Sequence, residues 1–314
     1  MTKQILVTGA SGYLGQAIAQ RLLRAGFTVD GLVRSDDAAR AVAAQGLGIV
    51  RGSLDDVERL DLAGYDGIID TATADHAPST SAFLDTLAGS GRTYIRTSGT
   101  GVYTDLGAGA ESPVVYTEAD SFVPAAVIAT RVESDDRVVR AAERDIRTIV
   151  IRPSMVYGDG GSEQLPHMLR YALAHGRAVY AGAGANRWSN VYLYDLAELY
   201  LLAYQYAPAG SLYNVAGGEL SMAEISDAIA RLLGQGRAHS VPVEEARAAL
   251  GARWVDVALA SNSRVDSRRA REELGWEVSG PSLMAELESG SYRRIWASKG
   301  DPHDHATIQS APRS

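Results

Sequence analysis

Short apolar runs alternate with amphipathic segments through the first half of the chain. Short apolar runs bounded by turn residues are typical of buried strands, whereas apolar positions three and four residues apart are typical of helices. Strands are predicted at residues 5–7, 28–33, 48–50, 67–70, 93–95 and 148–151, and helices at residues 16–25, 38–44 and 131–143. This alternation of strand and helix predicts βαβ units and a parallel sheet.

The regular alternation weakens beyond Pro153. Helices are predicted there at residues 164–174, 195–206, 221–233 and 243–250, and strands at residues 178–180 and 212–215. We therefore predict an α/β protein whose Rossmann-type, doubly wound parallel sheet spans residues 1–160 as a dinucleotide-binding domain. Residues 161–298 are predicted to form mainly a smaller C-terminal substrate lobe, with some segments returning to the main sheet. Residues 299–314 lack periodicity, and we predict a disordered tail there.

Composition removes several classes of function. The chain of 314 residues has no cysteine, which excludes a disulfide framework, a thiol nucleophile and a Cys-ligated zinc site. Six histidines in no visible cluster give no metal site either. The net charge of −8 and the absence of a long Lys/Arg run argue against a nucleic-acid partner. No apolar stretch reaches the roughly 18 to 20 residues that span a bilayer, so we expect no membrane partner and a cytoplasmic location.

A glycine-rich turn joins the first predicted strand to the first predicted helix. Gly9 allows a tight turn, Gly12 lets the backbone approach a pyrophosphate, and Gly15 lets the helix pack on the sheet. Free N–H groups at the start of the helix then face the phosphates. A purely structural turn without a ligand is the alternative. The residues predicted to contact a dinucleotide here are Gly9, Ser11, Gly12, Tyr13, Leu14 and Gly15.

The end of the second predicted strand indicates which dinucleotide binds. NAD-specific folds place an Asp or Glu there to bond the ribose 2′-hydroxyl. This chain has Val33 at that position, followed by Arg34 and Ser35. A guanidinium group and a hydroxyl suit a 2′-phosphate, which a carboxylate would repel. The sequence therefore favours NADP(H) over NAD(H), with a solvated surface arginine as the alternative interpretation.

Six further motifs follow the glycine-rich turn along the chain: GSLDD at residues 52–56, DTAT at 70–73, TSGTGVY at 97–103, RPSMVYG at 152–158, VYLYD at 191–195 and LGW at 274–276. With these motifs, the chain up to about Glu288 resembles the extended short-chain dehydrogenase/reductase superfamily, also called the NAD-dependent epimerase/dehydratase family. The resemblance implies further cofactor contacts: Ser53 and Leu54 near the adenine, Thr71 and Ala72 near the phosphates or ribose, and Pro153, Met155 and Val156 near the nicotinamide.

The catalytic pair of that superfamily is missing. Its members use a Tyr-x-x-x-Lys pair together with a Ser or Thr after the fifth strand. The lysines of this chain are Lys3 and Lys299, and neither follows a tyrosine by four residues. The usual spacing places Val127 at the Tyr position and Arg131 at the Lys position, with Asp135 at the acidic position that follows. Arg131 could still bind ribose hydroxyls, but it remains charged, and Val127 has no proton to give.

The Ser/Thr position itself falls on Gly99, between two hydroxyl-bearing residues. Ser98, Thr100 and Tyr103 follow the fifth strand, at the sheet edge where doubly wound folds bind ligands. We therefore predict catalytic roles among Ser98, Thr100, Tyr103 and Arg131, although Ser98 could contact only the cofactor. The predicted substrate pocket comprises Tyr116, Tyr157, His167, Trp188 and Tyr192. Of these, Trp188 and Tyr192 favour an apolar or aromatic substrate.

Three functions fit these observations. The first is an NADP(H)-dependent oxidoreductase, acting on a small apolar or aromatic carbonyl, alcohol or imine with a non-standard proton donor. The second is an epimerase, dehydratase or cyclase that keeps its cofactor. The third is a non-catalytic protein that senses NADP(H). The resemblance also implies a homodimer built on the helix that carries Arg131.

Overall fold

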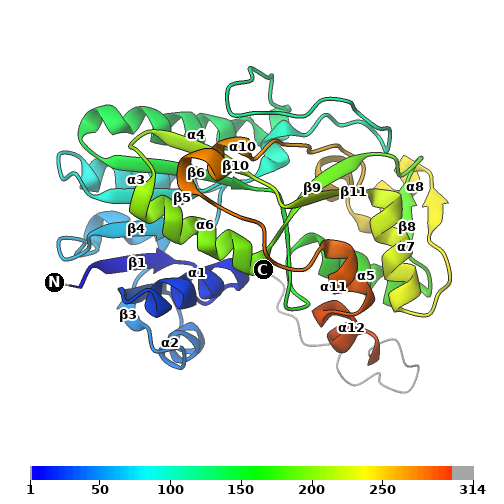
Figure 1. Ribbon diagram of the computed structural model, residues 1–314, viewed down its shortest axis with the longest axis horizontal. Coiled ribbons are helices and arrows are strands. Elements are labelled where there is room, and N and C mark those ends of the chain that lie inside the picture. Colours follow the sequence, from blue (N-terminus) through cyan, green and yellow to red (C-terminus); the bar gives the residue numbers. More distant parts are fainter. Residues whose placement is uncertain (1, 299–314) are drawn as a thin grey trace.

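A seven-stranded parallel sheet forms the centre of the larger lobe (Figure 1). The structure is a computed structural model that describes residues 2–298. The strands lie in the order β10-β6-β5-β4-β1-β2-β3. Their bounds are β1 Gln4–Thr8, β2 Thr28–Val33, β3 Gly48–Arg51, β4 Gly67–Asp70, β5 Thr93–Thr97, β6 Arg147–Pro153 and β10 Ser211–Val215. The strand order reverses between β1 and β4, and doubly wound sheets bind ligands beside that reversal.

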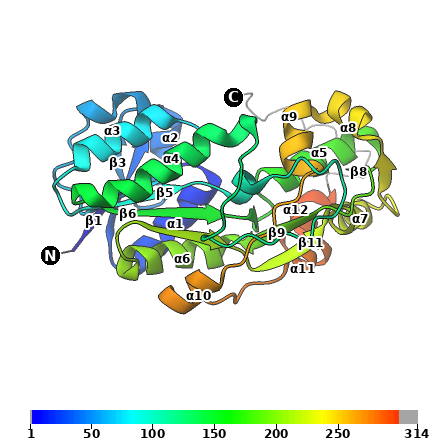
Figure 2. The same ribbon diagram turned by 90° about the horizontal axis from the view of Figure 1, so that it is seen from above.

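Helices cover both faces of this sheet (Figure 2). Helix α1 (Tyr13–Arg24) packs against α6 (Leu193–Tyr206) on one face, where their apolar sides join the side chains of Ile5 and Val7 in a buried core. Helix α3 (Ala77–Leu87) packs against α4 (Ala129–Arg140) on the other face. Helix α2 (Asp36–Ala43) flanks β2 and β3 at the edge. The inner strands are therefore buried on both sides, which explains why they appear in the sequence as apolar runs, whereas the edge strand β3 is largely exposed.

The smaller lobe has an apolar core of its own, built mostly from the second half of the chain. Its three-stranded sheet has the order β11-β9-β7, and a two-stranded sheet pairs β12 with β8. The elements are β7 Met155–Tyr157, β8 Val179–Ala181, β9 Arg187–Tyr192, β11 Gly218–Ser221, β12 His239–Val241, α5 Gln164–His175, α7 Met222–Leu232, α8 Val243–Leu250, α9 Ala252–Trp254, α11 Leu283–Glu288 and α12 Ser291–Trp296. Strand β10, by contrast, returns to the main sheet, where it pairs in parallel with β6.

The predicted fold class is confirmed, and the predicted strands of the main sheet are present within a few residues of their expected ends. Helix α3 was not predicted, because its sequence is rich in Ser and Thr and contains Pro78. Proline is well tolerated in the first turn of a helix, where its missing N–H would have had no partner. Helix α10 (Arg268–Leu274) was missed as well, and the predicted tail at residues 299–314 lies outside the described residues.

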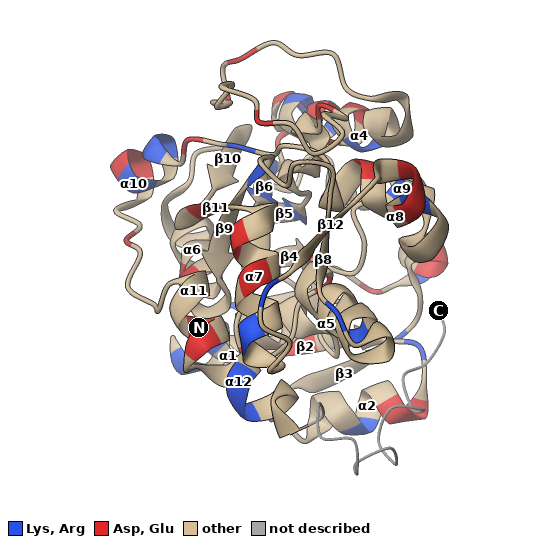
Figure 3. Cartoon of the chain, turned by 90° about the vertical axis from the view of Figure 1, so that its right-hand side faces the viewer, with Lys and Arg blue, Asp and Glu red and all other residues tan. Residues whose placement is uncertain are grey.

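Charged residues of both signs occur in helices α2, α8 and α10 (Figure 3). Within residues 2–298, no helix combines the length and the apolar character needed to cross a membrane.

Candidate active site

The turn between β1 and α1 leaves no room for a side chain at Gly9 or Gly15. Gly9 has a φ of +66°, and a Cβ there would lie 2.8 Å from the Cα of Ala72. A Cβ on Gly15 would lie 2.2 Å from the carbonyl oxygen of Gly9. The Gly12 N–H donates to that same carbonyl at 2.8 Å and closes the turn. Any side chain at Gly9 or Gly15 would therefore push backbone against backbone.

Helix α1 begins at Tyr13 without a side-chain cap on its first N–H groups. Its first turn also carries no acidic residue. Unsatisfied N–H groups and the positive end of the helix dipole together favour a phosphate at this point. A glycine cradle that a Cβ would fill, followed by an uncapped helix, fits the pyrophosphate of a dinucleotide.

The predicted ribose residues lie at the edge formed by β2 and β3. Val33 is buried at the end of β2, whereas Arg34 is exposed and forms no ion pair within residues 2–298. Ser35 caps α2, because its Oγ accepts the N–H of Ala38 at 3.2 Å. Arg51 is the register partner of Val33 on the neighbouring strand. The Arg51 guanidinium is paired with Asp36 at 2.5 Å, so Arg34 supplies the guanidinium at this edge that has no carboxylate partner within residues 2–298.

The remaining predicted cofactor residues follow β3 and β4. Ser53 Oγ donates to Asp56 at 2.7 Å, and this bond fixes the start of the short 3₁₀ helix that begins at Leu54. Thr71 Oγ1 donates to the Thr8 carbonyl oxygen at 2.6 Å, and the N–H of Ala72 donates to Thr8 Oγ1 at 3.2 Å. These bonds join the loop after β4 to the end of β1, beside the glycine turn.

One cavity of about 780 Å³ connects Tyr13 and Leu14, at the start of α1, with the loop after β5 and with the smaller lobe. Gly9, Gly12 and Gly15 are not among the described residues that line it. This volume lies within the range of small-molecule and cofactor sites. The predicted residues that line it are Tyr13, Leu14, Ser98, Thr100, Arg131, Pro153, Val156 and Trp188. Residues predicted to bind the cofactor and residues predicted to act on the substrate thus border the same space.

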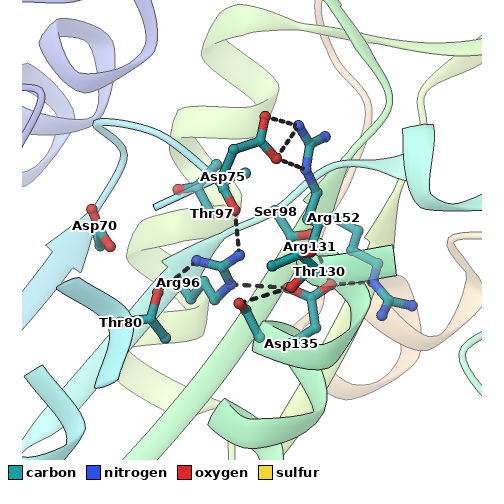
Figure 4. Close-up of polar contacts among 12 residues, drawn as sticks. Asp70, Asp75, Thr80, Arg96, Thr97, Ser98, Thr130, Arg131, Asp135 and Arg152 are labelled. Carbon is teal, nitrogen blue, oxygen red and sulfur yellow. Dashed lines mark hydrogen bonds and ion pairs between the residues drawn. The ribbon is translucent and has the colours of Figure 1, made fainter. Parts of the chain in front are cut away.

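A buried charged network lies beneath the cavity wall (Figure 4). Asp135 is fully buried, and its carboxylate accepts Arg96 Nε at 3.0 Å and Arg152 Nε at 2.9 Å. Burial by itself would lower the pKa of Arg152, but Asp135 and the hydroxyl of Tyr103 raise it by more, so the net shift is upward. The residue at the family's acidic position therefore joins β5, α4 and β6 in one ion-paired cluster.

Ser98 is tied to the same carboxylate. Its Oγ donates to Asp135 at 2.7 Å, so the single hydroxyl proton points into the protein. Ser98 can therefore offer a lone pair to the cavity but has no second proton to donate there. This geometry favours contact with a hydrogen-bond donor, such as a ribose hydroxyl, over the donation to a carbonyl that the sequence suggested.

Thr100 has the opposite arrangement. Its Oγ1 lies 2.9 Å from Ser263 Oγ, and that oxygen also lies 2.8 Å from the Thr100 carbonyl oxygen, so the single proton of Ser263 can serve either of the two Thr100 oxygens. Thr100 lines the cavity, although it is only 1% exposed. When Ser263 donates to Thr100 Oγ1, the Thr100 proton is left for a ligand, whereas the Ser98 proton is already bound to Asp135.

Arg131, which the sequence spacing predicts at the lysine position of the family, lines the cavity. Its Nε and Nη2 donate to the two oxygens of Asp75 at 2.9 and 2.8 Å (Figure 4). A Cβ built on Gly99 would lie 3.7 Å from Nη1 of Arg131. The bidentate pair therefore holds the guanidinium so that Nη1 faces the space that Gly99 leaves open.

Two tyrosines predicted in the site lie outside the cavity. The hydroxyl of Tyr103 donates to Asn214 at 3.1 Å and accepts Arg152 at 2.8 Å, and burial raises its pKa. Tyr116 stacks on that ring with a centroid distance of 4.6 Å. Neither ring is among the described residues that line the cavity. This placement argues against Tyr103 as the proton donor and against Tyr116 as a pocket residue.

The alternation of side chains along β7 explains why two more of the predicted site residues, Met155 and Tyr157, lie outside the cavity. Val156 lines the cavity, whereas Met155 and Tyr157 on either side of it point into the core of the smaller lobe. The Tyr157 hydroxyl donates to the Pro281 carbonyl oxygen at 2.9 Å, and burial raises its pKa. Successive side chains of a strand point in opposite directions, so only one of these neighbours can face the ligand.

His167 and Tyr192 also lie away from the cavity lining that residues 2–298 provide. His167 stacks on Trp254 with a centroid distance of 4.2 Å, and burial together with Arg170 lowers its pKa. The ring of Tyr192 packs where a Cβ on Gly280 would lie, 2.1 Å from its Cδ1. His167 therefore reaches the cavity only through Trp254.

The sequence missed part of the cavity wall, namely Asp75, Ser154, Trp254, Val257 and Ala258. Ser154 lies within the recognised motif at residues 152–158, and its buried Oγ has no partner within residues 2–298. The other four lie in loops or short helices that only tertiary packing brings to the site. No group of three or more potential metal ligands occurs in the described part of the chain.

Comparison with known proteins places this geometry in a family. The sequence matches the model of the NAD-dependent epimerase/dehydratase family over residues 5–216. It is 31% identical to the oxidase ucsJ of an Acremonium species, over 92% of this chain and 96% of the relative. It is 27% identical to a 4-hydroxy-2-methyl-3-oxo-4-farnesyl-3,4-dihydroquinoline-1-oxide ketoreductase of Stigmatella aurantiaca, over 68% and 67% of the two chains. The fold is similar to that of the solved dTDP-glucose 4,6-dehydratase of Bacillus anthracis in complex with NAD, with a TM-score of 0.74, 18% identity and coverage of 95% and 97%. The chain therefore belongs to the NAD-dependent epimerase/dehydratase family, whose enzymes are of the extended short-chain dehydrogenase/reductase type and use a nicotinamide cofactor.

Proposed function

We propose that this protein is an NADP(H)-dependent oxidoreductase that reduces a small, apolar or aromatic carbonyl compound or oxidises the corresponding alcohol. The observation that carries the proposal is the cavity that extends from Tyr13 and Leu14, which follow the glycine turn, to Thr100 and Arg131. A dinucleotide held by that turn and a substrate beside Thr100 would meet within it. Two relatives of this chain, one of which is named an oxidase and the other a ketoreductase, support redox chemistry of this kind.

The glycine turn and the start of α1 fit a dinucleotide, and this fit assigns roles to the residues around them. Gly9, Gly12 and Gly15 would hold the pyrophosphate, and Arg34 would bind a 2′-phosphate. When bound, the reduced nicotinamide supplies the hydride. The exposed position of Arg34, free of ion pairs among residues 2–298, supports NADP(H) in preference to NAD(H).

Two residues would act on the substrate oxygen in place of the missing tyrosine and lysine. Thr100 Oγ1 donates a hydrogen bond to that oxygen, and water in the cavity replaces the proton if it transfers. Nη1 of Arg131 stabilises the negative charge that develops on the same oxygen, because Asp75 fixes the guanidinium in place. Ser98, held by Asp135, positions the loop and accepts a hydrogen bond from the ligand.

The substitution Thr100→Val tests this assignment, because it removes the hydroxyl and keeps the shape. Loss of one preorganised donor lowers kcat by about 10²- to 10³-fold, and we expect a change in that range with a smaller change in KM. Thr104→Val is the matched control, since Thr104 is also buried but does not border the cavity within residues 2–298. Equal rates for the two variants would remove Thr100 from the mechanism.

A further inference from the structure

Trp254 borders the cavity and stacks on His167. The two rings have centroids 4.2 Å apart and planes inclined by 22°. His167 comes from α5 of the smaller lobe, and it is not among the described residues that line the cavity. The imidazole therefore supports one face of the indole from behind. The half-buried indole meets the cavity with the surface that His167 leaves uncovered.

The local backbone gives Trp254 this orientation. The short helix α9 ends at Trp254 and continues directly into one turn of π-helix, Val255–Leu259, in which the N–H of Ala260 donates to the Val255 carbonyl oxygen at 2.8 Å. Trp254, Val257 and Ala258 all line the cavity. Positions i, i+3 and i+4 share one helix face, so this segment presents a continuous apolar face to the ligand. Single π-helical turns occur frequently at functional sites.

A second indole borders the same space. Trp188 on β9 is 3% exposed, and its Nε1–H donates to the Ser261 carbonyl oxygen at 2.8 Å, which fixes the ring and satisfies its polar atom. Its remaining contribution to the cavity is aromatic surface. A cavity with two indole rings in its wall suits a flexible polar ligand poorly, because these rings offer such a ligand few hydrogen bonds.

The charged residues that line the cavity have no net charge. They are Asp75, Arg131, Glu163 and Arg253, two of each sign. Asp75 is already paired with Arg131 at 2.8 Å and lies 3.8 Å from Arg253. The wall therefore carries no excess positive charge that would draw a polyanionic substrate into the part of the cavity beyond the cofactor.

We propose that Trp254, supported by His167, is an aromatic shelf on which the substrate stacks a planar aromatic ring, so that the substrates are aryl or fused-ring carbonyl compounds. This inference rests on the proposed function for the identity of the ligand as a substrate. The binding energy of the shelf comes from ring stacking, which adds to the burial of apolar area. An aliphatic ring of the same size gains the burial but not the stacking.

Binding to the full-length protein tests the shelf without turnover. The probes are 2-acetylnaphthalene and its fully saturated counterpart, titrated against intrinsic tryptophan fluorescence and by calorimetry. Wild-type protein should bind the aromatic ketone about threefold to tenfold more tightly, which corresponds to the excess of an aromatic pair. Trp254→Leu should remove that preference, and Trp254→Phe should restore most of it. Tyr206→Leu is the control, because Tyr206 is an exposed aromatic residue outside the cavity lining in the described chain.

The two proposals fail in different ways. Equal affinity of wild-type protein for the two ketones, or an unchanged preference in folded Trp254→Leu, overturns the shelf. Aromatic binding that depends on Trp254 but consumes no NADPH supports the shelf and contradicts the proposed reductase. NADPH consumption at equal rates with both ketones supports the reductase and overturns the shelf.

Discussion

Replacing Asp135 with Asn would leave the buried guanidinium groups of Arg96 and Arg152 without their shared carboxylate. The side chains of Arg96 and Asp135 are fully buried, and that of Arg152 is 4% exposed. Arg96 would keep Thr80 as a partner at 3.0 Å, but the Nε atoms of both arginines would lose an ionised acceptor. The new amide group also offers donors where the arginines need acceptors. Breaking a buried ion pair by removing one partner costs about 3–5 kcal/mol.

This loss is large compared with the total stability of a domain, about 5–15 kcal/mol. Urea unfolding followed by circular dichroism measures it. With a slope of about 3 kcal/mol/M, the midpoint should fall by about 1 M or more. Asp136→Asn is the matched control, because Asp136 is the next residue of α4 and is exposed. A difference of less than about 0.5 kcal/mol between the two variants would refute the buried ion-pair network as a stabilising feature.

Three further predictions concern the cofactor site and the shelf. Arg34→Asp should weaken NADPH binding at least tenfold and NADH binding much less, measured by fluorescence titration; equal losses would contradict the 2′-phosphate assignment. Gly15→Ala should weaken NADPH binding at least tenfold, because the new Cβ would lie 2.2 Å from the Gly9 carbonyl oxygen. The control Gly64→Ala, in which the nearest atom to the new Cβ lies at 4.0 Å, should bind NADPH normally. Equal affinities of the two variants for NADPH would rule out a sterically closed turn. Burial lowers the pKa of His167, so the unfolded chain takes up a proton at a higher pH than the folded one, and the free energy of unfolding should fall as the pH drops through about 6.5. His167→Leu should reduce this dependence in urea titrations at several pH values, and an unchanged slope would contradict the assignment.

The glycine turn and the main sheet could be predicted because their signals are local. The spacing of Gly9, Gly12 and Gly15 reflects contacts within one turn, and the apolar runs of the sheet reflect burial on both faces. Arg131 could be placed by counting along a recognised motif. Its partner Asp75 could not, because the pair joins residues 56 positions apart.

The residues of the predicted substrate pocket could not be identified from the sequence, because their positions depend on contacts between segments that are far apart in the chain. Whether Tyr157 or Val156 faces the cavity depends on the register of β7 against β9. The side on which His167 lies depends on how α5 packs against the segment that contains Trp254. That segment lies almost 90 residues further along the chain, and its single π-helical turn has no simple periodicity. Aromatic composition indicated the kind of pocket, but not the residues that form it.

The most direct measurement is the absorbance of reduced nicotinamide, with NADPH and then NADH, during incubation of the wild-type protein with a panel of aryl ketones, aliphatic ketones and cyclic imines. We expect consumption of NADPH, faster than that of NADH, with formation of an equal amount of the reduced product. Conversion of substrate without net loss of NADPH would instead indicate an epimerase or dehydratase that keeps its cofactor. Tight NADPH binding without conversion of any compound would contradict the oxidoreductase proposal and favour a cofactor-sensing protein.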